Sequence, residues 1–165
     1  MEKYKILIVE DQTPTLDSIS YAIKKAIFLD TNARPRIGDE KSDEVEQELR
    51  EKGIDFARCY NEAEGIITDL PNHYDLVFLD HRLPYENCTN LEHNLEAFSD
   101  KVQDIGYGLI QKIRQYQPDA KIIGTSSLSK DKLKKFEEPD FYLDKTSVRK
   151  IDKNLTQILE EINRY

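Results

Sequence analysis

The sequence predicts an α/β protein built on a doubly wound, five-stranded parallel sheet. Short apolar runs rich in β-branched and aromatic residues alternate with segments whose apolar residues recur at helical spacing, the pattern of repeated strand–helix units. The apolar runs are continuous rather than alternating, so helices are expected on both faces of the sheet. Because such crossovers are right-handed, the flavodoxin-like strand order 2-1-3-4-5 is the expected arrangement.

Five short apolar runs are the expected strands, because none is long enough to form a helix of its own. The second run is the least continuously apolar, so it is expected near a sheet edge. In chain order the runs occupy residues 6–9, 56–60, 76–79, 122–123 and 141–143.

Apolar stripes at helical spacing predict the helices that cover the sheet. The last stripe is the clearest, with Ser147 placed as an N-cap and lysines and glutamates on the opposite face. A short helix anchored by Leu133 and Phe136 is expected between the fourth and fifth strands. The main stripes are Leu16, Ile19, Ile23 and Ala26; Ala63, Ile66, Ile67 and Leu70; Leu109, Ile110 and Ile113; and Val148, Ile151, Leu155, Ile158, Leu159 and Ile162.

Two segments, about 31–54 and about 85–105, are longer than the connections that such a fold requires. The first holds an acidic stretch in which Val45 and Leu49 form an apolar pair, which predicts a solvated surface helix. The second contains Leu91, Leu95, Phe98 and Val102 at spacings that predict an extra helix over or beside the third helix. The chain 1–165 is therefore expected to be one domain with two insertions.

The composition excludes several classes of function. A net charge of -8 and a pI near 5.0 argue against sequence-independent binding of nucleic acid, because such binding needs a clustered basic face. No apolar run is long enough to span a membrane, and the N-terminus lacks the pattern of a secretory signal. The two cysteines, Cys59 and Cys88, are far apart and have no metal-binding spacing, so a cytoplasmic protein with free thiols is expected.

Polar residues that carry chemistry follow four of the five expected strands. In a doubly wound sheet the carboxyl ends of the strands meet at one crevice, where ligands bind. A single aspartate at a strand end is most often a cap or a turn former, so the joint placement is what indicates a site. The residues are Glu10 and Asp11 after the first strand, Asp80 after the third, Thr125 and Ser126 after the fourth, and Lys145 after the fifth.

This combination predicts a magnesium-assisted phosphoryl site. Three carboxylates brought together repel one another unless protons or a cation offset their charge. Hard oxygen ligands in a small polar cleft suit Mg²⁺, which is commonly held by one or two carboxylates and a phosphate. An ammonium and a hydroxyl on the opposite wall would hold the other phosphoryl oxygens, and a carboxylate between them can act as nucleophile.

The motifs KILIVEDQ, YDLVFLDHRLP, AKIIGTSS and FYLDKTS resemble the CheY-like receiver domains of two-component response regulators, in order and approximate spacing. The resemblance implies that a histidine kinase or phosphotransfer protein phosphorylates Asp80, and that output passes to a downstream protein by direct contact. It implies a signalling phosphoacceptor rather than an enzyme, one that promotes its own phosphotransfer and dephosphorylation. No nucleic-acid or membrane partner is expected.

The resemblance also assigns roles by position. It implies that Glu10, Asp11 and Asp80 hold Mg²⁺, with the backbone carbonyl of Arg82 completing the metal shell. The hydroxyl that bonds the phosphoryl group is expected at Ser126 rather than Thr125. The remaining roles fall on Lys145, as the lysine that contacts the phosphoryl group, and on Tyr142, as the aromatic switch.

The sequence departs from the receiver pattern in three places. Thr146 stands where a proline commonly follows the lysine, which puts the cis-peptide of that loop in doubt. The stretch from Ser126 to Lys145 is shorter than usual. The glycine that follows the phosphorylation loop appears only at Gly106 or Gly108, beyond the second insertion.

Two other functions of this fold class need residues that this chain lacks. A haloacid-dehalogenase-type phosphatase needs a second acid where this chain has Arg82. A flavodoxin-type flavin binder needs a phosphate loop where this chain has Glu10 and Asp11. The remaining alternative is a receiver-like adaptor that works without phosphorylation, through contacts made by its insertions.

Overall fold

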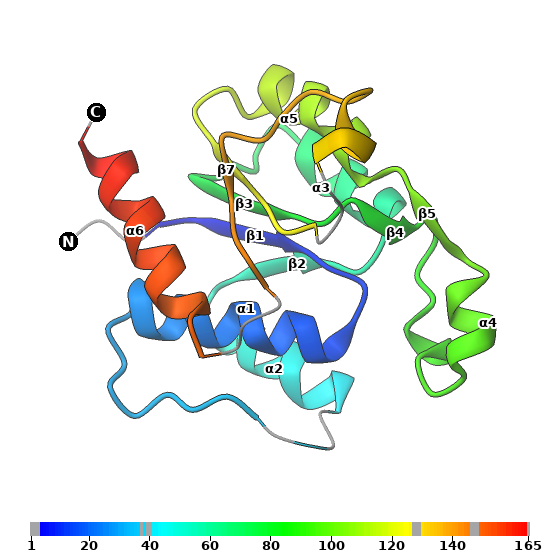
Figure 1. Ribbon diagram of the computed structural model, residues 1–165, viewed down its shortest axis with the longest axis horizontal. Helices are drawn as coiled ribbons and strands as arrows, with labels where there is room; N and C mark the ends of the chain where they lie inside the picture. The colour runs from blue at the N-terminus through cyan, green and yellow to red at the C-terminus, as the bar shows by residue number, and fades with distance from the viewer. Residues whose placement is uncertain (1–3, 37, 39–40, 127–129, 146–148, 165) are drawn as a thin grey trace.

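The computed structural model describes residues 4–36, 38, 41–126, 130–145 and 149–164, and its main sheet confirms the predicted strand order. Five parallel strands lie in the order β2-β1-β3-β6-β7 (Figure 1). This is the order 2-1-3-4-5, because β4 and β5 form a separate sheet. The strands are β1 (Ile6–Val9), β2 (Asp55–Ala57), β3 (Leu76–Leu79), β6 (Lys121–Gly124) and β7 (Phe141–Tyr142).

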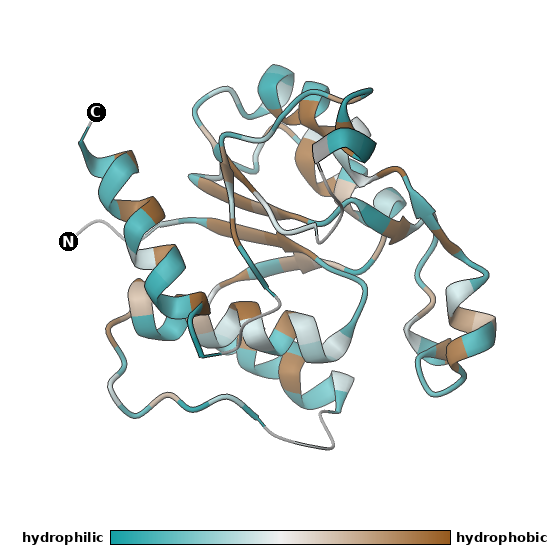
Figure 2. Cartoon of the chain, in the orientation of Figure 1, coloured by the Kyte–Doolittle hydropathy of each residue, from teal (hydrophilic) through white to brown (hydrophobic). Residues whose placement is uncertain are grey.

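Helices cover both faces of the sheet, as the continuous apolarity of the strands predicts. Ile6 and Ile8 of β1 belong to one core cluster, while Leu7 and Val9 belong to the other, so the strand alternates between two buried faces. In Figures 1 and 2 the apolar strands form the central layer, with helices above and below. The first face carries α1 (Thr13–Ala26), α2 (Ser42–Glu51) and α6 (Ile151–Asn163), and the second carries α3 (Tyr60–Thr68) and α5 (Ile110–Tyr116).

Most of the predicted helical stripes are buried where the sequence places them, with differences at the helix ends. Leu70 is 76% exposed, because α3 ends at Thr68 before the stripe is complete. The expected helix after the fourth strand is only a 3₁₀ turn, η3 (Lys130–Leu133), although Leu133 is buried. The described part of the last helix begins at Ile151, and Thr146, Ser147 and Val148 lie outside the described residues.

The first insertion is tied firmly to α1. Val45 and Leu49 of α2 are fully buried in the first core cluster, so one side of this acidic helix is packed rather than solvated. Two ion pairs join at Glu48, which contacts Lys24 at 2.6 Å and Arg36 at 2.7 Å. Arg36 also contacts Asp17 of α1 at 2.6 Å.

The second insertion differs from the single extra helix that its apolar spacing predicts. The antiparallel strands β4 (Arg82–Pro84) and β5 (Val102–Asp104) form its base, and the tip holds a 3₁₀ turn, η1 (Thr89–Leu91), and a short helix, α4 (Leu95–Ser99). Figure 1 shows α4 apart from α3 and α5. Leu95 is 78% exposed and Phe98 is buried, so the four expected apolar residues do not form one stripe. No described helix has the length and apolarity needed to cross a membrane.

Candidate functional site

Three carboxylates converge at the carboxyl edge of the sheet. Glu10 and Asp11 follow β1 and Asp80 follows β3, and these strands are paired neighbours. The backbone amide of Asp80 bonds to the Val9 carbonyl, so the ladder continues to the edge of the site. One carboxylate oxygen from each acid lies within 4.8 Å of the others, and all three side chains are buried. The structure therefore brings together the three residues expected to hold a metal.

Lys145 lies between two of these acids. Its Nζ atom is 3.0 Å from Oε1 of Glu10 and 3.0 Å from Oδ2 of Asp80. Lys145 follows β7 at the sheet edge, two strands away from Asp80, so only the sheet order brings it here. The second carboxylate oxygen of Asp80 accepts a hydrogen bond from the His81 amide at 2.8 Å.

The charges in the site are strongly coupled. Burial raises the pKa of Asp80 to about 7, Glu10 adds to the shift, and Lys145 opposes it. Burial likewise raises the pKa of Glu10 to about 7, again against the pull of Lys145. Burial opposes the charge of Lys145 itself, but the two carboxylates outweigh that effect and raise its pKa. The single ammonium is thus shared by acids that together carry more negative charge than it offsets.

The donor set fits a hard divalent cation. Asp11 Oδ2 is buried and has no hydrogen-bond partner among the residues that the structure describes, although buried polar atoms are nearly always paired. Burial raises the pKa of Asp11, and the neighbouring Asp80 adds to that shift. An oxygen-binding cation such as Mg²⁺ would satisfy the Asp11 oxygen and offset the excess negative charge.

Asp11, Asp80 and Lys145 open onto a pocket of about 210 Å³, whereas Glu10 contacts Lys145 without lining it. Arg82 lines it, while its side chain is mostly exposed and lies 3.5 Å from Asp104. Sequence reasoning missed the residues that the insertion and α1 contribute, because nothing in their local pattern ties them to the strand ends. The full lining is Asp11, Gln12, Thr15, Asp80, Arg82, Phe98, Ser99, Val102 and Lys145.

Besides Glu10, two residues assigned from the receiver resemblance, Ser126 and Tyr142, do not line this pocket. Ser126 is partly buried just beyond β6, and Tyr142 is 37% exposed in β7. Thr125 is fully buried, and its hydroxyl has no hydrogen-bond partner within the described ranges. The roles of Ser126 and Tyr142 therefore stay predictions.

The loop after Asp80 is closed by a glycine and a buried histidine. A Cβ on Gly106 would stand 1.9 Å from the Asp80 carbonyl oxygen, so this position admits no side chain. The Gly106 amide donates to the His81 carbonyl at 2.7 Å, and the Tyr107 amide donates to His81 Nδ1 at 3.0 Å. His81 also packs against the rings of Tyr107 and Phe136, which accounts for its burial. Of the two glycines expected near this loop, Gly106 is the one that lies against the Asp80 backbone, while Gly108 has room for a Cβ.

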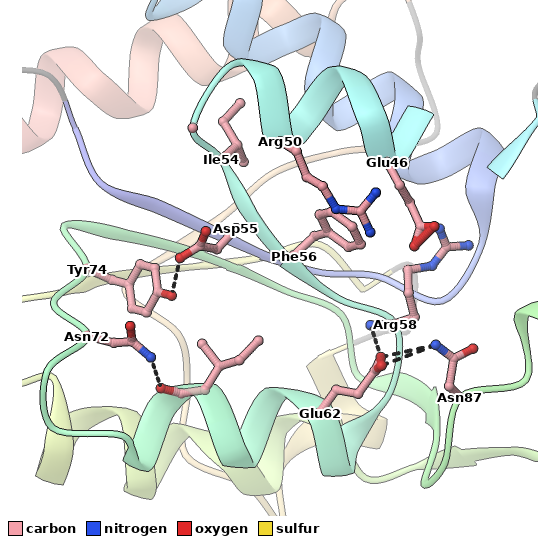
Figure 3. A pocket seen from close by; sticks show the side chains of 12 residues that line it. Glu46, Arg50, Ile54, Asp55, Phe56, Arg58, Glu62, Asn72, Tyr74 and Asn87 are labelled. Atoms are coloured by element: carbon pink, nitrogen blue, oxygen red, sulfur yellow. Dashed lines mark hydrogen bonds between the residues drawn. The ribbon is translucent and has the colours of Figure 1, made fainter. Parts of the chain in front are cut away.

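A larger groove lies elsewhere, along β2. It has a volume of about 650 Å³ and is bordered by α2, β2 and α3 (Figure 3). Its lining mixes acids, arginines and apolar groups, and Tyr74 donates to Asp55 across it at 2.5 Å. It contains none of the three converging acids or Lys145, so the smaller acidic pocket is the candidate site.

Comparison with known proteins supports the same fold. No protein-family model matches the sequence, and no curated protein matches it. Among solved structures, the BeF3-activated DrrB receiver domain shares 16% identity, with a TM-score of 0.57 over 99% of this chain and all of that chain. This chain has the receiver-domain fold. A second receiver domain, the CheY-like one from Methylobacillus flagellatus, shares 18% identity, with a TM-score of 0.52 over 98% of this chain and 99% of that chain.

The strand order of this fold explains why the residues of the acidic pocket meet at one edge of the sheet. The fold positions the carboxyl ends of β1, β3 and β7 around one crevice, and that crevice holds Glu10, Asp80 and Lys145. The second insertion is built into the loop that follows Asp80, between β3 and α5. It is therefore an addition at the carboxyl edge of the sheet, beside the converging acids.

Proposed function

We propose that residues 1–165 form a single phosphoacceptor receiver domain of a two-component pathway in the cytoplasm. Asp80 accepts a phosphoryl group from a histidine kinase or phosphotransfer protein in an Mg²⁺-dependent reaction, and output follows by contact with another protein. The observation that carries the proposal is the position of Lys145 Nζ, 3.0 Å from both Glu10 and Asp80. This cation would meet the oxygens of a phosphoryl group bonded to Asp80.

Asp80 is placed to act as the nucleophile. Its Oδ1 atom is held by the His81 amide, while Oδ2 faces Lys145 at the pocket that Asp80 lines. One carboxylate oxygen would form a P–O bond as the P–N bond of a phosphohistidine donor breaks, and the leaving imidazole would take a proton. Lys145 would then exchange part of its contact with the acids for the incoming phosphoryl oxygens.

Glu10, Asp11 and Asp80 would hold Mg²⁺, with the Arg82 carbonyl as a further oxygen ligand. When bound, Mg²⁺ would offset the negative charge that gathers as a phosphoryl group reaches three carboxylates. Asp11 supplies the strongest support for this assignment, because its buried Oδ2 atom has no hydrogen-bond partner in the part of the chain that the structure describes. Ser126 and Tyr142 are proposed to respond after transfer, Ser126 by bonding a phosphoryl oxygen and Tyr142 by changing rotamer.

Phosphorylation with a small donor tests this function directly. Acetyl phosphate with Mg²⁺ should add one acid-labile, hydroxylamine-sensitive phosphoryl group, detected by intact mass. Asp80→Asn should abolish the modification, whereas Asp119→Asn, at an exposed position, should leave it unchanged. Modification of a serine, threonine or histidine instead would contradict the mechanism. No modification of the wild type under any donor would favour a phosphorylation-independent adaptor.

A further inference from the structure

The second insertion forms part of the acidic pocket. Phe98, Ser99 and Val102 line it together with Asp11 and Asp80. Phe98 is only 5% exposed, yet it belongs to neither core cluster of the sheet. Phe98 is therefore buried outside the main core, at the wall of the pocket.

The start of the insertion is fastened to α3. The Asn61 amide donates to the Tyr85 carbonyl at 3.0 Å, and the rings of Tyr60 and Tyr85 stack with centroids 5.7 Å apart. Asn87 donates to both oxygens of Glu62, at 3.3 and 3.2 Å, as Figure 3 shows. These contacts fix the chain where it leaves β4.

The tip of the insertion is fastened by Glu92. Its Oε1 atom accepts hydrogen bonds from Arg58 Nη2 at 2.5 Å and from Thr13 Oγ1 at 2.8 Å. The same Arg58 nitrogen donates to the backbone carbonyl of Asp11 at 2.8 Å. We call the contacts of Glu92 with Arg58 and Thr13 the latch. The latch joins the insertion to the loop that carries a metal-binding acid.

The buried charge of Arg58 favours the latch, because Arg58 Nε and Nη1 have no hydrogen-bond partner among the described residues and Glu92 supplies the offsetting negative charge. Arg58 is 1% exposed, and a buried guanidinium is costly unless a negative charge offsets it. Among the residues that the structure describes, Glu92 is the carboxylate that forms an ion pair with Arg58, and its own side chain is 24% exposed. Release of the tip would leave the buried guanidinium of Arg58 without the Glu92 carboxylate. The docked position of the tip is therefore favoured.

We propose that residues 85–101 are a fixed wall of the phosphoacceptor pocket, held by the latch, that determines by size which reagents reach Asp80. The inference rests on the proposed function only in taking Asp80 as the acceptor. A pocket of about 210 Å³ admits a small acyl phosphate, whereas a bulky donor must displace the wall or fit its outer surface. The wall also shields an aspartyl phosphate from water and slows its hydrolysis.

Thiol reactivity at position 80 measures this access without any phosphoryl chemistry. Asp80→Cys would be made in a Cys88→Ser background and treated with iodoacetamide, a small reagent, or with bulky DTNB. Adding Glu92→Ala should raise the DTNB rate about tenfold and the iodoacetamide rate much less, because a charged hydrogen bond holds the wall. Phe98→Ala should act in the same direction by shortening the wall itself.

Glu96→Ala is the matched control, because Glu96 is an exposed glutamate of the same insertion. It should leave both thiol rates at the parent value. Buried Cys59 monitors general unfolding, and its reactivity should not change. A rise at Cys59 equal to the rise at position 80 would overturn the inference, as would folded Glu92→Ala and Phe98→Ala variants that react with DTNB at the parent rate.

Hydrolysis of the phosphorylated protein separates this inference from the proposed function. With Asp80 intact, Glu92→Ala should shorten the lifetime of the aspartyl phosphate relative to Glu96→Ala. If the wild type takes up no phosphoryl group, the proposed function fails. The thiol rates still test whether the wall limits access to position 80. If phosphorylation proceeds but lifetimes and thiol rates match those of Glu96→Ala, the wall alone is wrong.

Discussion

Gly106 lies so close to Asp80 that a Cβ at residue 106 would stand 1.9 Å from the Asp80 carbonyl oxygen. The end of the second insertion thus returns directly onto the backbone of the proposed phosphoacceptor. Hydrogen bonds from the amides of Ile105 and Gly106 to the His81 carbonyl hold this contact. The insertion therefore begins just after Asp80 and ends in contact with it. A change in the position of the insertion would thus shift the backbone of Asp80.

Gly106→Ala should destabilise the protein by about 1–3 kcal/mol or more, because its methyl group would meet backbone that has no room to move. Gly108→Ala is the matched control, since the nearest atom to its Cβ would be the Tyr60 hydroxyl at 3.9 Å. Urea unfolding of both variants measures the difference. Equal urea midpoints for the two variants would show that the loop around Asp80 can shift to accommodate the added methyl group.

The acidic pocket should make the free energy of unfolding depend on pH. Bound Mg²⁺ should oppose that dependence. The pKa values of Glu10 and Asp80 are raised to about 7 from ordinary values of 4.5 and 3.8. The folded state thus binds protons more tightly than the unfolded state. The stability from these groups is fully present below their ordinary pKa values and is lost as the pH rises through about 7.

Without metal, the free energy of unfolding should therefore fall between about pH 5 and about pH 8 at this site. Saturating Mg²⁺ should stabilise more at the higher pH, because protons compete for the same oxygens. Asp80→Asn should flatten both trends, which separates them from other titrating groups. Parallel pH profiles for the wild type and Asp80→Asn would contradict the prediction.

Neighbouring hydroxyls after β6 should behave in opposite ways. Thr125→Val should stabilise the free protein by up to about 1 kcal/mol, because it replaces a buried hydroxyl that has no hydrogen-bond partner among the described residues. Ser126→Ala should permit phosphorylation but weaken the conformational response, measured as the change in Tyr142 NMR signals on phosphorylation. If Thr125→Val weakens the response and Ser126→Ala does not, the hydroxyl has been assigned one residue too late.

The ion-pair network at Glu48 should hold the first insertion. Glu48→Gln removes the carboxylate that both Lys24 and Arg36 contact, and should cost about 1–3 kcal/mol, less than a fully buried pair because Glu48 is 22% exposed. Glu44→Gln, on the exposed side of the same helix, should change stability by less than about 0.5 kcal/mol. Thermal unfolding at low and high salt distinguishes the two variants.

The sequence by itself determined the five strands of the main sheet, their order and the acids of the site. The buried strand runs are continuous and apolar, and parallel strands place their carboxyl ends together, so Glu10, Asp11 and Asp80 were predictable as neighbours. These features depend on local pattern and on general rules of chain connection. The positions of Ser126 and Tyr142 relative to the pocket do not follow from such rules, and neither residue lines it.

Only the tertiary structure decided how the second insertion folds. Its apolar spacing predicts one helix, but pairing of β4 with β5 and the latch at Glu92 impose a hairpin base with a short helix at the tip. Arg58 and Glu92 are 34 residues apart, and neither lies in a motif that predicts their contact. Long-range ion pairs and close backbone contacts, such as that of Gly106 with Asp80, form only once the sheet has brought their elements together, so no local pattern encodes them.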